Sequence, residues 1–339
     1  MIPKILISDP TLRDGNHAVS HQLNAHQIAS YMAAADAAGI PIVEVGHGNG
    51  LGASSLQIGE SLLDDVTILK IAKENLVHSK LGIHVMPGIA TINKDLKKAI
   101  DMGVDVFRVA CHCTEADITQ RHISFIRNKG KEVYGALMMN HMTSKEVLAE
   151  EAYKMQSYGA DGVILYDSAG ASLPSDVKEK VELMVSSLEI PVGYHAHNNL
   201  GLAIANSIMA VQSGATILDG TARGFGAGAG NTQLEVLVPV LEKIGYSTGI
   251  DFYKLLDLSD LAECELMKEI PSIKPDSVCS ALAGIFSGFS KHVKRISNEY
   301  GVDSRDIWFE LGRRKVVAGQ EDLIIEVAVK LAAEGEKRQ

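Results

Sequence analysis

The chain repeats one local pattern, in which a short run of apolar and β-branched residues is followed by a longer segment with helical periodicity. In four places a helix tail meets glycine and a strand-like run starts within a few residues, as in QSYGADGVIL. Most of the runs are almost continuously apolar, as strands buried on both faces of a parallel sheet are. Eight runs are predicted as strands, at 4–9, 41–46, 80–86, 104–110, 132–138, 161–166, 190–197 and 215–220.

Eight strands alternating with helices is the count of a closed (β/α)8 barrel, a TIM barrel, and we predict this α/β architecture. A doubly wound parallel sheet is the alternative, because it alternates the same elements. Polar residues at the ends of the predicted strands favour the barrel, in which all eight carboxyl ends converge on one mouth. These residues are Arg13, Asp14, Glu44, His47, Arg108, Asn140, His141, Asp167, Ser168, His195, His197 and Asp219.

After residue 250 the pattern changes to helical segments without a convincing strand between them. The stretch PSIKPDS at 271–277 has the composition of a linker. We therefore predict a barrel catalytic domain at 1–255 and a small helical C-terminal domain at 256–339.

Composition excludes several classes of protein. The formal net charge of −10 disfavours binding to nucleic acids or anionic membranes, which select basic surfaces. Four cysteines in 339 residues do not make a disulfide framework, so Cys111 and Cys113 are expected to be reduced thiols. No run approaches the ~18 apolar residues of a membrane span, and the first residues lack the apolar stretch of a signal peptide. We expect a cytoplasmic protein.

The stretch GYHAHNN places His195 and His197 two residues apart on the predicted seventh strand. Residues i and i+2 of a strand point the same way, so both imidazoles would face the barrel mouth. A hydrogen-bonded structural pair is one interpretation, and a divalent metal site is the other. The metal site requires an anionic third ligand, which Asp14 supplies just past the first strand. This ligand set leaves positions open for substrate and suits Mn²⁺, Mg²⁺, Co²⁺ or Zn²⁺.

Three residues near these candidate ligands are candidates for further roles. A guanidinium at Arg13 can stabilise a developing oxyanion, although a surface or ion-paired arginine is the alternative. An imidazole at His17 suits a general base, although a solvated loop histidine is the alternative. Asn231 ends the glycine-rich loop RGFGAGAGN and is a candidate oxygen ligand. That loop is not a dinucleotide fingerprint, because no strand with a ribose-binding acid follows it.

Motifs spread over residues 4–332 resemble the 4-hydroxy-2-oxovalerate aldolases, class II pyruvate aldolases among the DRE-type TIM-barrel metallolyases that include hydroxymethylglutaryl-CoA lyase. The motifs LRDG and HAHN are typical of the superfamily, and HCTEAD and GRRKVVAGQED are more specific to the aldolases. The resemblance implies a lyase that cleaves 4-hydroxy-2-oxopentanoate, or a close homologue, to pyruvate and acetaldehyde or another short aldehyde.

The same resemblance implies roles for individual residues. Asp14, His195 and His197 would bind Mn²⁺, Arg13 would stabilise the pyruvate enolate, and His17 would act as the base. The residues expected to contact the substrate are Arg13, Ser168, which would bind its carboxylate, His195 and Phe286. Phe286 stands where these aldolases carry a tyrosine, so the ring is kept and the hydroxyl is lost.

The resemblance also implies a partner, an acylating acetaldehyde dehydrogenase that receives the aldehyde through a channel during aromatic hydrocarbon catabolism. A homo-oligomer or hetero-oligomer is expected. Two other functions compete with the aldolase. A Claisen-type synthase would add an acetyl-CoA enolate to a 2-oxoacid and would need acyl-CoA recognition. A non-catalytic metal-binding subunit would have no use for Arg13 and His17.

Overall fold

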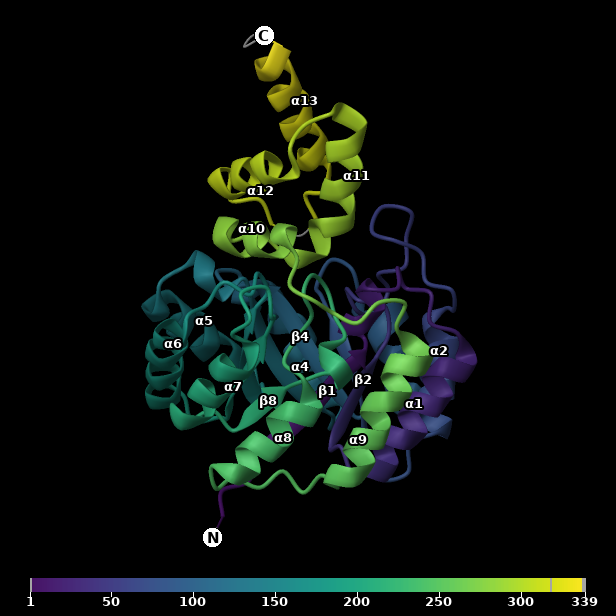
Figure 1. The fold of residues 1–339 in the computed structure, drawn as a ribbon. Coiled ribbons are helices and arrows are strands. Elements are labelled where there is room, and N and C mark those ends of the chain that lie inside the picture. Colours follow the sequence, from purple (N-terminus) through teal and green to yellow (C-terminus); the bar gives the residue numbers. More distant parts are fainter. Residues whose placement is uncertain (1, 318, 337–339) are drawn as a thin grey trace.

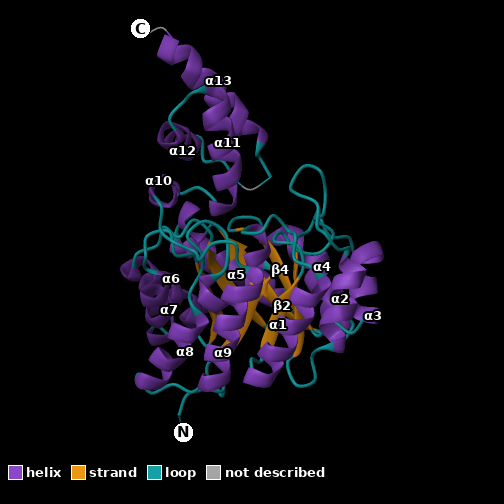
Figure 2. Ribbon diagram, turned by 45° about the vertical axis from the view of Figure 1, so that its right-hand side comes forward, coloured by secondary structure: helices purple, strands orange, loops and turns teal. Residues whose placement is uncertain are grey.

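A computed structural model describes residues 2–317 and 319–336. Eight parallel strands form a closed barrel in chain order inside a ring of helices (Figures 1 and 2). The strands are β1 (Leu6–Leu12), β2 (Ile42–Val45), β3 (Lys80–Val85), β4 (Val106–His112), β5 (Glu132–Met138), β6 (Gly162–Asp167), β7 (Val192–Ala196) and β8 (Ile217–Asp219). The predicted (β/α)8 barrel is confirmed, because β1 pairs with β8 through Leu6 and Ile217 and leaves no open sheet.

Helices on the outside of the barrel start and end where local chemistry favours it. Asn24 and Gln27 form a reciprocal capping box at the start of α1, and Gly39 ends that helix in the left-handed conformation at φ 78°. The helices that connect the strands are α1 (Ala25–Ala38), α2 (Asp65–Glu74), α3 (Lys97–Asp101), α4 (Gln120–Asn128), α5 (Lys145–Ser157), α6 (Pro174–Ser187) and α7 (Ala203–Gln212). After β8, α8 (Leu234–Lys243) and α9 (Phe252–Leu261) complete the ring against α1.

Apolar side chains fill both the barrel interior and the layer between strands and helices. The interior cluster consists of Ile42, Val106, Ala110, Tyr134, Ala136, Ile164, Tyr166 and Ile217. A barrel interior packed in this way is a core rather than a pore. Function is therefore confined to the mouth at the carboxyl ends of the strands.

The first strand extends beyond its predicted range of 4–9, because β1 continues through Pro10 to Leu12. The register against β2 shifts between Asp9 and Leu12, which marks a β-bulge. Proline cannot donate to a sheet ladder and is tolerated at such irregularities. Bulges are frequent beside active sites because they redirect the residues that follow. Here the residues that follow are Arg13 and Asp14.

Four C-terminal helices stand over the barrel on the side away from the N-terminus (Figure 1). They are α10 (Pro275–Ala283), α11 (Ser290–Tyr300), α12 (Ser304–Arg313) and α13 (Asp322–Glu336). Their own core includes Ile285, Phe289, Val293, Ile296, Ile307, Trp308, Leu311, Val316, Ile324, Val327 and Ala328. We call α10–α13 the helical domain.

The domain division at residues 255 and 256 stays a prediction. Leu255, Leu258 and Leu266 are buried in the barrel core, whereas Ile285 belongs to the core of the helical domain. We propose that the boundary lies later, in the segment 267–274.

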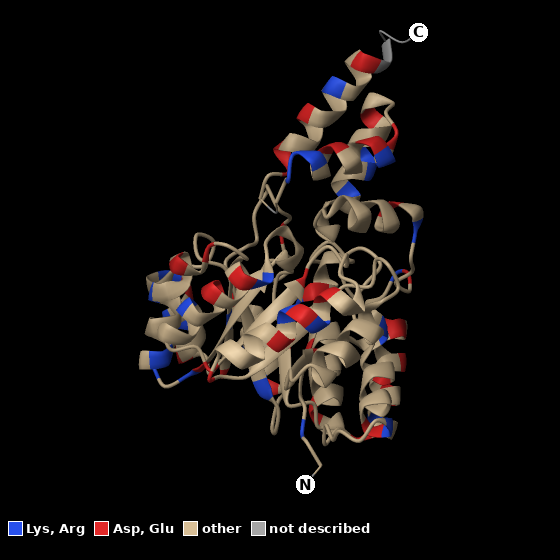
Figure 3. Ribbon diagram, turned by 90° about the vertical axis from the view of Figure 1, so that its left-hand side faces the viewer, with Lys and Arg blue, Asp and Glu red and all other residues tan. Residues whose placement is uncertain are grey.

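Charged residues of both signs are spread over the outer helices and the helical domain (Figure 3). The described residues include no helix long and apolar enough to cross a bilayer. Cys111 and Cys113 are buried, unpaired cysteines.

Leu311 is completely buried in the helical domain beside the only tryptophan of the chain, Trp308. We expect Leu311→Ala to destabilise this domain by about 2–5 kcal/mol, because it removes buried methyl groups and leaves a cavity. Denaturant unfolding followed by Trp308 fluorescence should show an earlier transition. Leu282→Ala is the matched control, because Leu282 on α10 is 65% exposed. Equal midpoints for the two variants would contradict this assignment of the core.

Candidate active site

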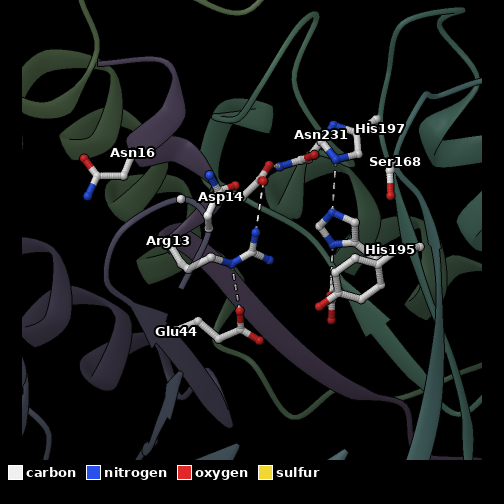
Figure 4. A network of polar contacts seen from close by, with 12 residues as sticks. Arg13, Asp14, Asn16, Glu44, Ser168, His195, His197 and Asn231 are labelled. Atoms are coloured by element: carbon white, nitrogen blue, oxygen red, sulfur yellow. Dashed lines mark hydrogen bonds and ion pairs between the residues drawn. The ribbon is translucent and has the colours of Figure 1, made fainter. Parts of the chain in front are cut away.

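Three side chains that are far apart in the sequence meet at the barrel mouth. Asp14 lies in a short 3₁₀ helix directly after β1, His195 lies in β7, and His197 follows β7 (Figure 4). Each offers one ligand atom, and these atoms all lie within 4.8 Å of one another. All three residues are buried. Barrel closure produces this cluster, because it places β1 and β7 on either side of β8.

The two imidazoles are oriented as a pair of metal ligands. His195 Nδ1 lies 3.0 Å from a carboxylate oxygen of Asp219, so Nδ1 donates a proton to it and Nε2 keeps its lone pair. His195 Nε2 faces His197 Nε2 at 3.4 Å. Burial lowers the pKa of His197 to about 4, which keeps this ring neutral. Two imidazole nitrogens turned toward one point, with a carboxylate beside them, fit a divalent cation.

The Asp14 carboxylate is charged although it is buried. Burial opposes its ionisation, but His197, Arg13 and His195 hold its pKa below the ordinary value. Asn231 Nδ2 donates a hydrogen bond to Oδ2 of Asp14, and Asn231 is bridged to His197 through the backbone. A Cβ added at Gly226 would lie 2.6 Å from the same Oδ2. Because Gly226 has no Cβ, the Asp14 carboxylate stays accessible on the side that faces Gly226.

A chain of buried ion pairs lies beneath the cluster. Arg13 bonds Asp14 at 3.0 Å and Glu44 at 3.2 Å. Arg108 bonds Glu44 at 2.5 Å, and it contacts Asp219 through both terminal nitrogens. The chain contains three carboxylates and two guanidiniums, which leaves one negative charge in a buried setting. Uncompensated buried charge is costly, so a divalent cation at Asp14 would stabilise the whole group.

Arg13 keeps one donor available. Its Nε and Nη1 are engaged by Glu44 and Asp14. Within residues 2–317 and 319–336, no group accepts a hydrogen bond from its buried Nη2. A buried guanidinium N–H without a partner is a strong donor for an anionic oxygen that enters the site.

His17 lies at the edge of a cavity of about 770 Å³ between the barrel mouth and the helical domain, which Gly226 and Phe286 also line. Its imidazole packs so closely on Gly48 that an added Cβ there would lie 2.4 Å from His17 Nε2. Burial lowers the pKa of His17, although Asp14 opposes the shift. The ring is therefore neutral at pH 7, as a general base must be. The ring of Phe286 stands edge-on to it, with 6.1 Å between centroids.

Ser168 follows β6 and lies beside the two histidines in the close view (Figure 4). Its Oγ accepts a hydrogen bond of 3.1 Å from the backbone N–H of Met139, so its own proton remains to be donated. Met139 adopts a left-handed conformation at φ 57°. Backbone strain at a non-glycine residue persists where surrounding structure imposes it, and such residues cluster at active sites.

The sequence indicated where the polar residues lie but not what several of them do. The prediction that Arg108 lies at a strand end is wrong, because it lies inside β4. Its ion pairs with Glu44 and Asp219 could not be predicted from the sequence. A charged residue inside an otherwise apolar strand, such as Arg108 in VDVFRVA, is the signal for such a buried network. The sequence gave no indication that Asn199 forms a hydrogen bond with Ser287, which lies between α10 and α11.

Solved structures share this architecture. The carboxyl transferase domain of *Rhizobium etli* pyruvate carboxylase, solved with pyruvate and biocytin, superposes with a TM-score of 0.83 at 15% identity, covering 98% of this chain and 61% of that chain. At this identity the likeness shows the fold alone. The N-terminal domain of a putative aldolase from *Bacteroides vulgatus* superposes with a TM-score of 0.72 at 25% identity, covering 87% of this chain and 97% of that one.

Sequence relatives are much closer. A 4-hydroxy-2-oxovalerate aldolase of *Pectobacterium atrosepticum* is 61% identical over 99% of this chain and 98% of its own length. One of *Spirochaeta aurantia* is 59% identical with the same coverage. The HMGL-like family model matches residues 4–262, and a DmpG-like communication domain matches residues 271–333. The chain therefore belongs to the HMGL-like family and, within it, to the 4-hydroxy-2-oxovalerate aldolases, which are carbon–carbon lyases.

Proposed function

We propose that the protein cleaves 4-hydroxy-2-oxopentanoate, or a close homologue, to pyruvate and acetaldehyde or another short aldehyde. The observation that carries this proposal is the cluster of Asp14, His195 and His197 beside the unpartnered donor of Arg13. The identity to aldolases over almost the whole chain supports the same reaction. A divalent cation held by the cluster supplies a Lewis acid that polarises the 2-oxo group and fixes the orientation of the substrate.

The chain's own residues carry the proton and charge transfers. His17 removes the proton of the C4 hydroxyl, directly or through one water, because its ring is neutral and faces the cavity. The C3–C4 bond then breaks, the C4 oxygen becomes the aldehyde carbonyl, and the bonding electron pair enters the enolate of pyruvate. Arg13 Nη2 donates to the oxygen that gains this charge. Ser168 Oγ donates to the substrate carboxylate. The proton that His17 took from the C4 hydroxyl returns, directly or through water, to C3 and completes pyruvate.

Charge balance at the mouth supports an anionic substrate. The chain of ion pairs from Asp14 to Asp219 carries a net charge of −1, counted from three carboxylates and two guanidiniums. A divalent cation changes this to +1, and a monoanionic oxoacid brings the sum to zero. The site thereby selects a carboxylate that can bind beside the cation over a neutral aldehyde.

Several finer assignments belong to this proposal. We propose Mn²⁺ as the cation, a cytoplasmic location, and a role in aromatic hydrocarbon catabolism. The match to a DmpG-like communication domain supports a partner that is an acylating acetaldehyde dehydrogenase, to which the aldehyde is channelled in a hetero-oligomer.

The competing functions are less well supported. The Claisen-type synthase requires acyl-CoA recognition, and the relatives at 50–61% identity that share almost the whole chain are aldolases by name. A non-catalytic metal-binding subunit would not require His17 at the cavity or the free donor on Arg13.

His195→Ala should abolish metal binding and pyruvate release together, because it removes one of two imidazole ligands. Equilibrium dialysis with Mn²⁺ and a lactate dehydrogenase assay with 4-hydroxy-2-oxopentanoate measure the two properties. His26→Ala is the control, because this histidine lies on the outer face of α1 with its side chain 79% exposed. Full turnover by His195→Ala without bound metal would refute the ligand assignment.

Arg13→Ala should bind Mn²⁺ but lose kcat by about 10²–10³-fold, which is the typical effect of removing an oxyanion donor. Arg13→Lys preserves the charge beside Asp14 and Glu44 and removes the forked geometry, so it separates charge from direct donation. Far-ultraviolet circular dichroism checks that both variants fold. A decrease of less than tenfold in Arg13→Ala would remove Arg13 from the enolate role.

Phe286→Tyr tests how the cavity treats the aldehyde. The ring stands against His17 and offers no hydrogen bond, so the present site distinguishes aldehydes by shape. In the condensation of pyruvate with a series of aldehydes, we expect Phe286→Tyr to change stereochemical preference at C4, because a hydroxyl near His17 can orient the aldehyde oxygen. Identical product ratios from both proteins would show that position 286 does not contact the aldehyde.

A further inference from the structure

A lysine in the second helix of the helical domain, α11, binds the loop that carries His17. Lys291 lies in the first turn of α11, and its Nζ donates to the backbone oxygens of His17 and Ala18, both at 3.1 Å. The same nitrogen donates to Ser20 Oγ at 2.7 Å. An ammonium has three protons, so these contacts engage all of them.

The position of Lys291 is electrostatically unfavourable for its own helix. The N-terminus of a helix carries partial positive charge, and a cation in the first turn is repelled by it. Burial lowers the pKa of Lys291, and the charge of Lys268, which lines the same cavity, lowers it further. The three oxygen acceptors on the loop after β1 offset the repulsion that the ammonium of Lys291 experiences.

The loop that Lys291 binds has an unfavourable backbone conformation. Ser20 and His21 are consecutive non-glycine residues with φ values of 57° and 62°. Such a conformation persists only where neighbouring groups impose it. On its barrel side, His21 Nδ1 accepts a hydrogen bond of 3.3 Å from Gly48, and the ring stacks on His47 at 3.6 Å. Lys291 binds the same loop through oxygen atoms of His17, Ala18 and Ser20.

Further contacts connect the segment between α10 and α11 to other barrel loops. His141 Nε2 lies 3.0 Å from the backbone oxygen of Gly284, and Asn199 donates to Ser287 Oγ. The segment 284–291 is thereby attached to the loops after β5, β7 and β1. The attachment at Lys291 is the one that reaches the backbone of His17 itself.

We propose that Lys291 is a positioning residue that holds the His17 imidazole over the cavity and thereby couples the helical domain to the general base. This inference rests on the proposed role of His17 in the aldol reaction. A change in the position of α11, for instance when a partner binds the helical domain, would reach His17 through the ammonium of Lys291. Among the described residues, the hydrogen bonds of Lys291 Nζ go to His17, Ala18 and Ser20 and not to Asp14, His195 or His197.

Lys291→Met tests the proposal, because methionine keeps an unbranched stem and lacks the donors. We expect kcat to fall on the order of 10–100-fold, as misplacing a catalytic group does, with KM and Mn²⁺ affinity little changed. Lys291→Arg should restore part of kcat, because a guanidinium can donate to the same oxygens. Lys254→Met is the matched control, because Lys254 also lies in the first turn of a helix, α9, is exposed and outside the cavity, and its ammonium has no polar partner among the described residues. Equal kcat values for wild type and Lys291→Met would overturn the proposal.

A double-mutant cycle with His17→Ala separates positioning from a general structural effect. If Lys291 acts through His17, adding Lys291→Met to His17→Ala should cause no further loss of kcat. Multiplicative losses would overturn the proposal, because they would place Lys291 in an independent role. Trp308 fluorescence and Mn²⁺ binding report on the fold and the metal site of each variant. Absence of pyruvate release from the wild-type protein would instead refute the proposed function on which this inference rests.

Discussion

The buried chain of ion pairs from Asp14 to Asp219 is the constraint on which the site depends. It connects the first strand with the last, and it orients His195 through the Asp219 carboxylate. The net negative charge of this chain favours the binding of a cation. A bound cation in turn favours an anionic oxoacid. Removing the Asp219 carboxylate would affect the orientation of His195 and the compensation of the Arg108 charge together, because buried charges depend on each other for compensation.

The barrel and the position of its site could be predicted from the sequence. Short apolar runs at regular intervals define buried parallel strands, and barrel closure follows from their number. The i and i+2 spacing of His195 and His197 sets their common direction, and Asp14 after the first strand is the acidic residue that the sequence offers as their partner. Local rules were sufficient here because the side chains project from regular strands or directly from a strand end.

Other features depend on contacts between segments that local patterns do not encode. The bulge at Pro10 sets where Arg13 and Asp14 emerge, and it arises from the register between two strands. The link from Lys291 to the His17 loop spans 274 residues of sequence and depends on how the helical domain packs on the barrel. A lysine in the first turn of a helix, against the helix dipole, was the available sign of such a contact.

We propose that Asp14, His195 and His197 bind a single divalent cation. Anomalous X-ray diffraction at the manganese absorption edge, from crystals grown with Mn²⁺, tests it most directly. We expect one peak about 2.0–2.3 Å from an Asp14 oxygen and from a ring nitrogen of each histidine. A fully loaded crystal with its manganese peak elsewhere, and none between these three residues, would contradict it.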